Sequence, residues 1–446
     1  MVPMLIMAKI KSRGEFMKDK NLVAKTPPMG WNSWDCYGAS VTEEELRKNA
    51  EYMATHLKQY GYEYIVCDIQ WYEPTADSSE YHKFVPLEMD EYARLLPAVN
   101  RFPSAADGKG FGPIAEYIHS LGLNFGIHMM RGIPRQATLY NTPIKGTTTT
   151  AREIAHPFSV CSWNTDMYGV MAGVYGAQEY YDSLFELYAE WGVDYVKVDD
   201  ICVTEYKPHD LYSAKEEIEM IRIAIDRCNR PIVLSLSPGP AILEQAEHLA
   251  KNANMWRITG DFWDNWRSLY AMFERCKQWA PYVKEGCWPD CDMLPVGHIA
   301  IRNGDPTFAN RMTMFSKEEQ RTMLTLWCIF RSPLMIGCEL RDLDEWTLSL
   351  LTNSDVLNLL KDSRDAHEVM NANGMIVWES SLLDGRKNIA VFNTHYATMS
   401  VEIPLERLAI ETPCEWKDLW NQSIIKTSKQ LRLEVKAHDA VLLQMQ

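Results

Sequence analysis

The chain has 446 residues, 46% of them hydrophobic and 24% charged, which is the balance of a globular protein with a large and a smaller domain, or with two to three domains. Its formal net charge of −15 repels phosphate backbones and excludes a general nucleic-acid binder, and no apolar run reaches the roughly 18 residues of a membrane-spanning helix. The 15 Trp, 21 Tyr and 13 Phe exclude a disordered chain.

Residues 1–22 precede the first structural pattern in the sequence. Their apolar run is short, and the charged residues follow that run rather than precede it, which is not the order of a secretory signal. We interpret this segment as a leader that is only weakly ordered.

The 11 cysteines are scattered along the chain, and none of them forms a CxxC pair. Cys287 and Cys291 are the closest two, and without a second pair they do not predict a zinc site. Free thiols at this density are typical of a reducing compartment, so we expect a cytoplasmic protein.

Short apolar runs alternate with helical patterns from about residue 25 to residue 345. Helical patterns such as 42–61, which opens with the capping box of Thr42 and Glu45, separate the runs. Strands that are apolar on both faces and alternate with helices predict a parallel sheet covered by helices. Eight such units favour a (β/α)8 TIM barrel over residues 23–362, and an open doubly wound sheet is the competing architecture. The expected strands lie within 29–35, 62–71, 123–130, 194–200, 230–239, 254–261, near 283–288, and within 332–340.

The pattern changes to a period of two after about residue 365. Apolar side chains alternate with other residues around Ile389 and Val391, and again in 431–435, with no helical pattern between these runs. A small antiparallel β domain is therefore expected over residues 363–446.

Polar side chains stand where the predicted barrel strands end, which is where TIM barrels place their catalytic groups. Carboxylates with aromatic neighbours suit sugars, because CH faces stack on rings while carboxylates accept hydroxyl hydrogen bonds. Each residue also has a plainer interpretation: an Asp as a helix N-cap, a His as a core residue, a Trp as packing. The candidates are Asp68, His128, Asp199, Asp200, Ser235, Ser237, Asp261 and Glu339, with Trp34, Trp71 and Trp256 as aromatic walls.

Longer motifs resemble glycoside hydrolase family 27, the α-galactosidases and α-N-acetylgalactosaminidases. The first is TPPMGWNSWDCYG (26–38), followed in order by DYVKVDD (194–200), WRITGDFWDNW (256–266) and GCWPDCDMLPVG (286–297). The resemblance implies a (β/α)8 barrel, a C-terminal antiparallel β-sandwich domain, and hydrolysis with retention of configuration, without a metal or organic cofactor.

By the same resemblance, Asp199 corresponds to the catalytic nucleophile and Asp261 to the acid/base. In a retaining enzyme these carboxyls lie about 5–5.5 Å apart. Lys197 and Arg257 would keep Asp199 ionised, while Asp261 must hold a proton at neutral pH. The sugar-binding positions implied are Trp34, Asp68, His128, Lys197, Arg257 and Asp292.

One departure from the family pattern concerns the sugar specificity. Family galactosidases carry an Asp-Asp pair after the second strand, whereas this chain has Asp68 followed by Ile69. The pair reads O4 and the C6 hydroxymethyl group, so Ile69 leaves a C6 hydroxyl without its charged acceptor. β-L-Arabinopyranose is α-D-galactopyranose without that group, and some family members are β-L-arabinopyranosidases. We therefore expect a preference for β-L-arabinopyranosides over α-galactosides, the alternative being that another group reads O6.

Ser237 is a second departure, because α-N-acetylgalactosaminidases place a small Ser there to admit an acetamido group. An α-N-acetylgalactosaminidase is therefore an alternative function. A metal-dependent hydrolase would need His/Asp clusters at strand ends, where only His128 offers itself. A sugar-binding barrel without catalysis conflicts with the presence of both catalytic aspartates. The expected partner is a small oligosaccharide or glycoside, and a homo-oligomer stays open.

Overall fold

The computed structural model describes residues 19–410 and 413–446. Most of the predicted leader, residues 1–18, lies outside the described residues. Its last part is packed: Lys20–Leu22 form a 3-10 turn, the Lys20 ammonium donates to the carbonyl of Ala253 (2.8 Å), and the Asn254 amide donates to the carbonyl of Lys20 (3.0 Å). Contacts with the larger domain therefore already include residues that the sequence assigned to the leader.

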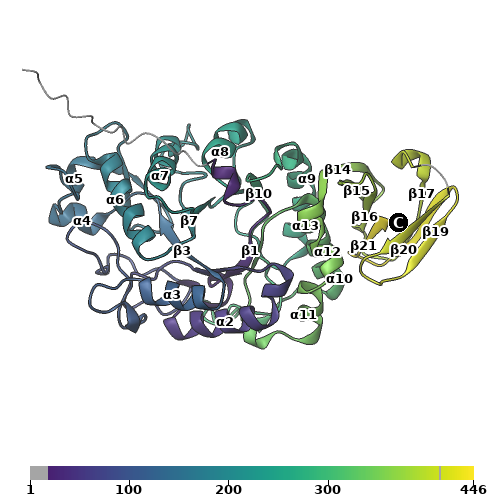
Figure 1. Ribbon diagram of the computed structural model, residues 1–446, viewed down its shortest axis with the longest axis horizontal. Coiled ribbons are helices and arrows are strands. Elements are labelled where there is room, and N and C mark those ends of the chain that lie inside the picture. Colours follow the sequence, from purple (N-terminus) through teal and green to yellow (C-terminus); the bar gives the residue numbers. More distant parts are fainter. Residues whose placement is uncertain (1–18, 411–412) are drawn as a thin grey trace, which may run out of the picture.

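Eight parallel strands form the central sheet, in the order β10-β9-β8-β7-β3-β2-β1-β13 (Figure 1). From β1 to β10 this order follows the chain, and the last strand, β13, pairs with β1, so the sheet has no reversal as in a doubly wound sheet. A parallel bridge between Leu294 and Ile336 joins the two edges, so the TIM-like barrel is confirmed. The strands are β1 (Met29–Asn32), β2 (Tyr64–Cys67), β3 (Asn124–Met130), β7 (Tyr195–Asp199), β8 (Val233–Leu236), β9 (Met255–Arg257), β10 (Trp288–Asp290) and β13 (Leu334–Ile336).

Helices follow the barrel strands. The capping box of Thr42 and Glu45 begins α2 as predicted, and α2 ends at His56, earlier than expected. Among the described residues, no helix is both long and apolar enough to cross a bilayer. The helices are α1 (Trp34–Tyr37), α2 (Glu43–His56), α3 (Gly112–Ser120), α4 (Arg135–Tyr140), α5 (Ala151–Ile154), α6 (Ala177–Glu190), α7 (Lys215–Arg227), α8 (Ala246–Asn252), α9 (Trp266–Trp279), α10 (Lys317–Phe330), α11 (Glu345–Leu351), α12 (Ser354–Leu357) and α13 (Leu359–Asp362).

The seventh barrel strand lies later than the sequence indicated. The expected segment near 283–288 contains Lys284, Glu285 and Gly286, which form a turn closed by a bridge between Lys284 and Cys287. The extended part, β10, begins only at Trp288. This shift matters for the site, because it brings Asp290 to the last position of the strand.

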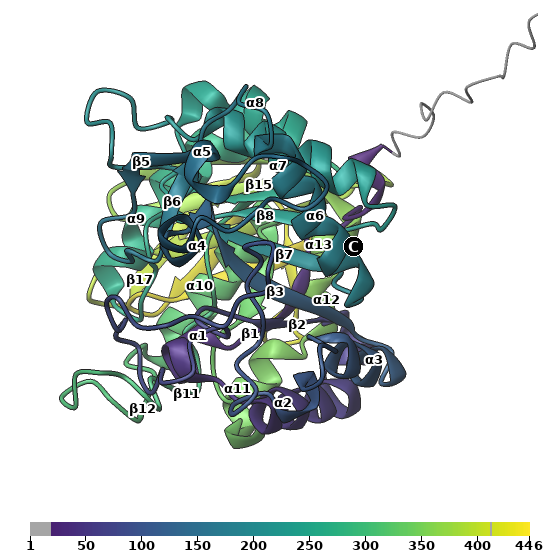
Figure 2. The same ribbon diagram turned by 90° about the vertical axis from the view of Figure 1, so that its left-hand side faces the viewer.

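Two small sheets were not expected from the sequence. Between β3 and β7, the strands β4 (Ile133–Pro134), β6 (Met167–Val170) and β5 (Ala155–Val160) form an antiparallel sheet, which Figure 2 places toward the viewer. A β11–β12 pair (His298–Ile299 and Arg311–Met312) follows β10. Their strands are short, and β5 is partly exposed with a register shift, so they lack the clean alternation that marks a strand.

The C-terminal residues form the predicted antiparallel domain. A six-stranded sheet, β14-β15-β16-β21-β18-β19, lies against the two-stranded sheet β17-β20. Ile389 and Val391 pack inside this domain, whereas the alternate residues Ala390 and Phe392 join the core of the barrel. The strands are β14 (Ser363–Ala372), β15 (Met375–Leu382), β16 (Lys387–Asn393), β17 (Met399–Pro404), β18 (Cys414–Asp418), β19 (Ile424–Thr427), β20 (Gln430–Val435) and β21 (Ala440–Met445).

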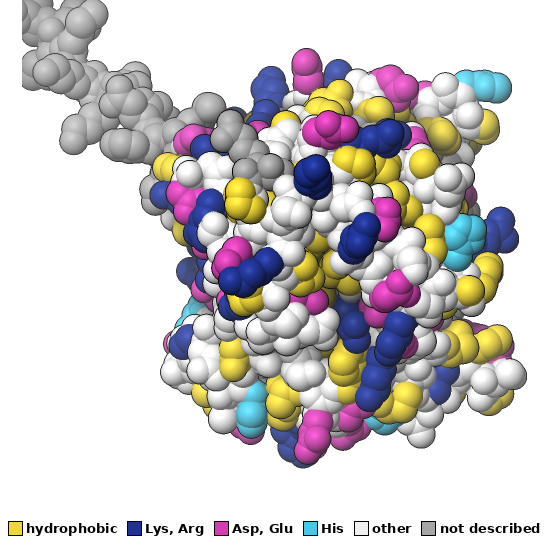
Figure 3. All heavy atoms as spheres, turned by 90° about the vertical axis from the view of Figure 1, so that its right-hand side faces the viewer, with side chains coloured by type: hydrophobic (Ala, Val, Ile, Leu, Met, Phe, Trp, Pro, Cys, Tyr) yellow, Lys and Arg dark blue, Asp and Glu magenta, His cyan; other side chains and the backbone are white. Residues whose placement is uncertain are grey.

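The two domains share an apolar interface. Helix α10 lies between the barrel and the sheet of the smaller domain (Figure 1). Phe273 of α9 contacts Phe392 of β16 edge-on, with ring centroids 4.9 Å apart. The opposite, outer side of the smaller domain carries positive and negative side chains interspersed, as Figure 3 shows.

We predict that Phe392→Ala lowers the free energy of unfolding by about 3–5 kcal/mol, because it leaves a cavity between the domains. Urea unfolding followed by Trp fluorescence measures this change. Leu383→Ala is the control, since that side chain is 69% exposed in the same domain, and we expect less than about 0.5 kcal/mol. Equal effects of the two substitutions would show that the interface carries no packing energy.

Candidate active site

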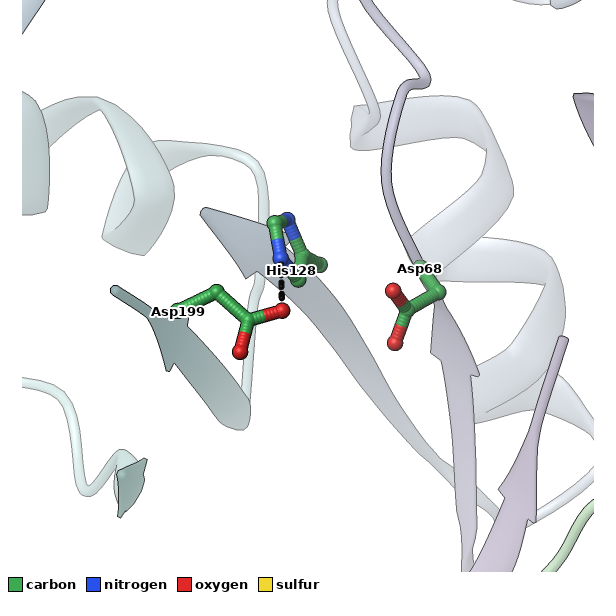
Figure 4. Close-up of side chains that lie close together, drawn as sticks. All are labelled: Asp68, His128 and Asp199. Atoms are coloured by element: carbon green, nitrogen blue, oxygen red, sulfur yellow. Dashed lines mark hydrogen bonds and ion pairs between the residues drawn. The ribbon is translucent and has the colours of Figure 1, made fainter. Parts of the chain in front are cut away.

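Asp68, His128 and Asp199 meet at the carboxyl ends of three adjacent barrel strands, β2, β3 and β7 (Figure 4). One ligand-type atom of each residue lies within 4.8 Å of the others. The His128 Nε2 lies 2.7 Å from the Asp199 Oδ2, a contact that assigns the proton to Nε2 while the carboxylate accepts. His128 therefore contacts the predicted nucleophile and is not an isolated core residue.

Lys197 supplies the positive charge of this cluster. Its Nζ lies 2.9 Å from the Asp68 Oδ2 and 3.8 Å from the Asp199 Oδ2. Burial by itself raises the pKa of Asp199, but Lys197 and the His128 hydrogen bond together lower that pKa well below its ordinary value. The expectation that Asp199 stays ionised agrees with these contacts.

The three clustered side chains also have the composition of a metal site, which the sequence analysis missed because it could not place His128 beside two aspartates. The ammonium of Lys197 already lies between the two carboxylates. A divalent cation bound to the same oxygens would be repelled by that charge. The geometry thus favours a fixed lysine rather than a metal as the local cation.

Asp68 is held at both of its carboxylate oxygens. Oδ2 accepts from the Asn32 side chain (2.6 Å) and from Lys197, while Oδ1 accepts from the backbone N–H of Ile69 (2.9 Å). The backbone N–H of Asp68 in turn donates to the Ser33 hydroxyl (3.0 Å). Ile69 is only 1% exposed and packs in the apolar core, so the position after Asp68 offers no charged acceptor.

A second group of acidic side chains gathers around Arg257 at the end of β9. Its Nη2 lies 2.8 Å from the Asp261 Oδ1 and 2.9 Å from the Asp292 Oδ2. Its Nη1 donates to the Ser237 hydroxyl (3.1 Å). Asp292 also accepts from the backbone N–H of Phe262 (2.8 Å). The structure therefore brings Ser237, Arg257, Asp261 and Asp292 together as predicted from the sequence.

The two predicted catalytic aspartates differ strongly in exposure. The side chain of Asp199 is 10% exposed, whereas that of Asp261 is 67% exposed. Burial alone would lower the pKa of Arg257, but the carboxylates of Asp292, Asp261 and Asp199 raise it, so the guanidinium feels both aspartates. The predicted nucleophile thus lies deep in the site and the predicted acid/base lies at its mouth.

Two further acids lie beneath Arg257, and the sequence analysis did not single them out. Burial and then the charge of Asp292 raise the pKa of Asp290 to about 7. Burial and Asp292 also raise the pKa of Asp35, whose Oδ2 has no hydrogen-bond partner among the described residues. Asp290 stands two residues before Asp292 in a motif already noted, and this spacing was the available signal.

Of the three Trp residues proposed as aromatic walls, only Trp34 is partly exposed. It stacks on Tyr81, with ring centroids 5.8 Å apart, and Tyr81 contacts Trp163. Trp71 and Trp256 are fully buried, and the indole of Trp71 donates to the carbonyl of His128 (2.7 Å). The prediction was wrong for these two. Trp256 lies in β9, which is buried on both faces, and Trp71 lies in the turn after β2, where it packs edge-on against Tyr72, Phe111 and Trp191.

Arg131 contacts the backbone of Asp199, the predicted nucleophile. Its backbone N–H donates to the carbonyl of Asp199 (3.0 Å), and its side chain donates to the Asp200 Oδ2 (2.5 Å) and to the Glu217 Oε1 (2.9 Å). Asp200 has a positive φ of 55°, a conformation that this ion pair stabilises. Asp200 is therefore a structural residue rather than a second nucleophile.

Ser235 and Glu339 stand at the other predicted strand ends. Ser235 is a buried residue of β8, and Glu339 pairs with Arg341 at 2.7 Å. Glu339 also accepts from the hydroxyl of Tyr37, so its carboxylate is engaged away from the cluster of Asp68 and Asp199.

A TIM-like barrel with carboxylates at the ends of β2, β7, β9 and β10, and with an aromatic wall, defines the class as a glycoside hydrolase. The family profile described as "Alpha galactosidase A" matches residues 164–362, and "Alpha galactosidase C-terminal beta sandwich domain" matches residues 372–445. The chain belongs to glycoside hydrolase family 27.

Three relatives illustrate the range of the family. A variant of a β-L-arabinopyranosidase from Geobacillus stearothermophilus, solved with arabinose, is 57% identical, with a TM-score of 0.94 over 96% of this chain and 99% of that chain. A candidate α-N-acetylgalactosaminidase from Bacillus halodurans is 52% identical, with a TM-score of 0.85 over 94% of this chain and 97% of that one. An α-galactosidase from Oryza sativa is 27% identical, over 94% of this chain and 84% of the relative.

We predict that Lys197→Met moves the acidic limb of the pH profile of kcat/KM to higher pH, by about 1–3 units. Asp199 must be ionised to act, and without the ammonium its pKa rises, so activity is lost at a higher pH. Rates on a nitrophenyl glycoside between pH 3 and 8 measure the shift, relative to each enzyme's own maximum. Lys197→Arg keeps the cation and should retain the original limb; an unmoved limb in Lys197→Met contradicts the assignment.

We predict that Asp290→Asn removes a pH-dependent loss of stability. The pKa of Asp290 is raised from 3.8 to about 7, so the folded state holds a proton that the unfolded state releases. The stability from this group is complete below pH 4 and falls as pH rises to 7, by up to about 4 kcal/mol. The Tm of Asp290→Asn minus that of the native protein should therefore grow between pH 4 and pH 7. A constant difference would refute the raised pKa.

Proposed function

We propose that this chain is an exo-acting, retaining glycosidase that prefers terminal β-L-arabinopyranosyl residues and hydrolyses α-D-galactopyranosides more slowly. The observation that carries the proposal is Ile69, a buried aliphatic side chain directly after the sugar-binding position Asp68. The similarity to the Geobacillus β-L-arabinopyranosidase, at 57% identity, supports it.

The proposed reaction uses the two aspartates in two steps. The Asp199 carboxylate attacks the anomeric carbon and forms a glycosyl ester, while Asp261 donates a proton to the departing glycosidic oxygen. A water molecule then attacks the same carbon as Asp261 takes up a proton from it, which releases the sugar and restores both carboxyl groups. The Asp261 side chain is 67% exposed without substrate, so it can reach the glycosidic oxygen of a bound glycoside.

Lys197 and His128 have a defined part in this scheme. Both contact the Oδ2 of Asp199, at 3.8 Å and 2.7 Å, so the Oδ1 has neither of these contacts and is the oxygen we assign to the attack. Lys197 also contacts Asp68, which ties the nucleophile to the carboxylate proposed to bind sugar hydroxyls. The sugar and the nucleophile are thereby held in one frame, which lowers the entropic cost of the attack.

The preference for arabinopyranosides is expected from the free-energy cost of burying a C6 hydroxyl beside Ile69. A buried hydroxyl without a hydrogen-bond partner costs about 1–3 kcal/mol, or about 5- to 150-fold in kcat/KM. β-L-Arabinopyranose lacks the hydroxymethyl group and avoids this cost. Asp68 does not compensate, because Lys197, Asn32 and the backbone N–H of Ile69 take three of its acceptor sites and leave one on Oδ1 for the hydroxyl that it is proposed to bind.

An N-acetylgalactosaminide is the weaker candidate. Ser237 is fully buried, and its hydroxyl accepts from Arg257 at 3.1 Å. The hydroxyl is therefore already engaged by Arg257, which weakens the case for an acetamido group at this position. Because of the similarity to the Bacillus halodurans protein, at 52% identity, an N-acetylgalactosaminide is the next substrate to test if neither the arabinopyranoside nor the galactopyranoside is hydrolysed.

We also propose that the enzyme works in the cytoplasm on short glycosides. All 11 cysteines are free thiols, and even the Cys276 and Cys291 sulfurs, 3.5 Å apart, are not bonded. Thiols in such contact stay reduced most readily in a reducing compartment.

We predict that nitrophenyl β-L-arabinopyranoside exceeds nitrophenyl α-D-galactopyranoside in kcat/KM by tenfold or more. Ile69→Asp should shift this ratio toward galactoside by about 5- to 150-fold, because it restores an acceptor for the C6 hydroxyl. Ile69→Val is the matched control, since it stays apolar and should keep the preference. Asp199→Asn serves as the inactive blank.

A native preference for galactoside would contradict the role of Ile69 and leave an α-galactosidase that reads O6 elsewhere. Proton NMR of the first sugar released, before mutarotation, tests retention separately. An inverted product would overturn the double displacement whichever sugar is preferred.

A further inference from the structure

A row of three aromatic rings runs from the pocket to the protein surface. Trp34, just after β1, stacks on Tyr81 with an interplanar angle of 18° and centroids 5.8 Å apart. Tyr81 continues to Trp163, which lies between β5 and β6, at 5.6 Å and 41°. The inner two rings are half-buried, and Trp163 is 37% exposed. The row therefore has an inner end that is half-buried at the candidate site and an outer end open to solvent.

The inner end of the row lies beside the carboxylate of Asp68. The Trp34 backbone N–H donates to the Asn32 Oδ1 (2.9 Å), and the Asn32 amide donates to the Asp68 Oδ2 (2.6 Å). Burial, and after it the charges of Asp199, Asp68 and Asp261, raise the pKa of the Tyr81 phenol, which agrees with a position of this ring next to the space between the two proposed catalytic aspartates. A leaving group must depart through the same space, because its oxygen takes the proton of Asp261.

The segment that carries Trp163 is anchored over the end of β7. The Ser162 hydroxyl donates to the Glu205 Oε2 (2.7 Å), in the loop that follows β7. This hydrogen bond holds the residue next to Trp163 against the loop that follows β7.

We propose that Trp163, backed by Tyr81, forms a binding subsite for the leaving group and takes a flat ring of CH groups, a sugar or an aryl aglycone. This inference rests on the proposed glycosidase function and adds the aglycone to it. A pyranose presents a face of CH groups, and an aryl ring presents its π face, and both stack on an indole. The aglycone of a methyl glycoside is a methyl group without a ring, so it does not use the subsite.

The test compares Trp163→Ala with the native enzyme on glycosides that share one sugar and differ in the aglycone. We expect kcat/KM to fall about 2- to 12-fold for the nitrophenyl glycoside and for a disaccharide with a hexose leaving group. The methyl glycoside should be unchanged, and so should the inhibition constant of free arabinose, which fills only the inner pocket. Trp163→Phe keeps a ring and should restore most of the loss.

Phe158→Ala is the matched control. Phe158 lies on β5, the strand before the segment of Trp163, and is 83% exposed, but its described ring contact is with His156 rather than with Tyr81. It should leave all substrates unaffected. The larger of the two Trp163→Ala losses, aryl or hexose, identifies which ring the subsite takes.

Equal losses on methyl and nitrophenyl glycosides, or a weaker arabinose inhibition, would overturn the subsite and make Trp163 a structural support. No loss on any substrate would overturn it as well, and so would a changed oligomeric state of Trp163→Ala, which would make the indole a contact between copies. A failure of the proposed sugar preference can be told apart from a failure of the subsite, because the same aglycone series can be run on whichever sugar the native enzyme hydrolyses.

Discussion

The ammonium of Lys197 between two buried carboxylates is the interaction on which the rest of the site depends. Two negative charges at the ends of β2 and β7 repel each other in a poorly hydrated environment, and neither would remain ionised without a cation. Lys197 lies 2.9 Å from Asp68 and 3.8 Å from Asp199, and His128 adds a hydrogen bond of 2.7 Å. This arrangement requires β2, β3 and β7 to be neighbours with their carboxyl ends aligned, which is what the parallel barrel supplies.

Around Arg257, in the other half of the site, carboxyl groups outnumber the single positive charge. Arg257 pairs with Asp261 and Asp292, while further acids lie close by, and burial raises the pKa of Asp290 to about 7. One guanidinium cannot neutralise all of these carboxyls, so the deepest of them retain protons. The nucleophile side is thus built to keep a charge, and the acid/base side lies among groups that hold protons. This asymmetry is the one that two carboxylates need when one attacks and the other protonates.

The sequence predicted the architecture well because apolar runs and helical periods are local signals. It also indicated which candidate residues lie close together, since carboxyl ends of parallel strands must meet at one edge of the barrel. It could not predict that His128 contacts Asp199, because that depends on the register between β3 and β7. It missed Tyr81 and Trp163, which lie in segments without a clear period. It misjudged Trp71 and Trp256, because a Trp near the end of an apolar run can pack in the core as well as face the site. Trp256 is buried within β9, and Trp71 is buried in the turn after β2.

The same scaffold explains how one side chain can set the sugar preference. Asp68 is fixed by Lys197, Asn32 and the backbone of Ile69, so it has little freedom to rotate toward a second hydroxyl. Asp68 therefore cannot move to replace a hydrogen-bond acceptor that is missing at position 69. The side chain at position 69 then determines directly which sugar is preferred. The aglycone side follows the opposite principle: stacking on Trp163 demands only a flat ring, so it tolerates several leaving groups. Strict recognition of the inner sugar together with permissive recognition of the outer ring is the division expected of an exo-acting enzyme on varied short glycosides.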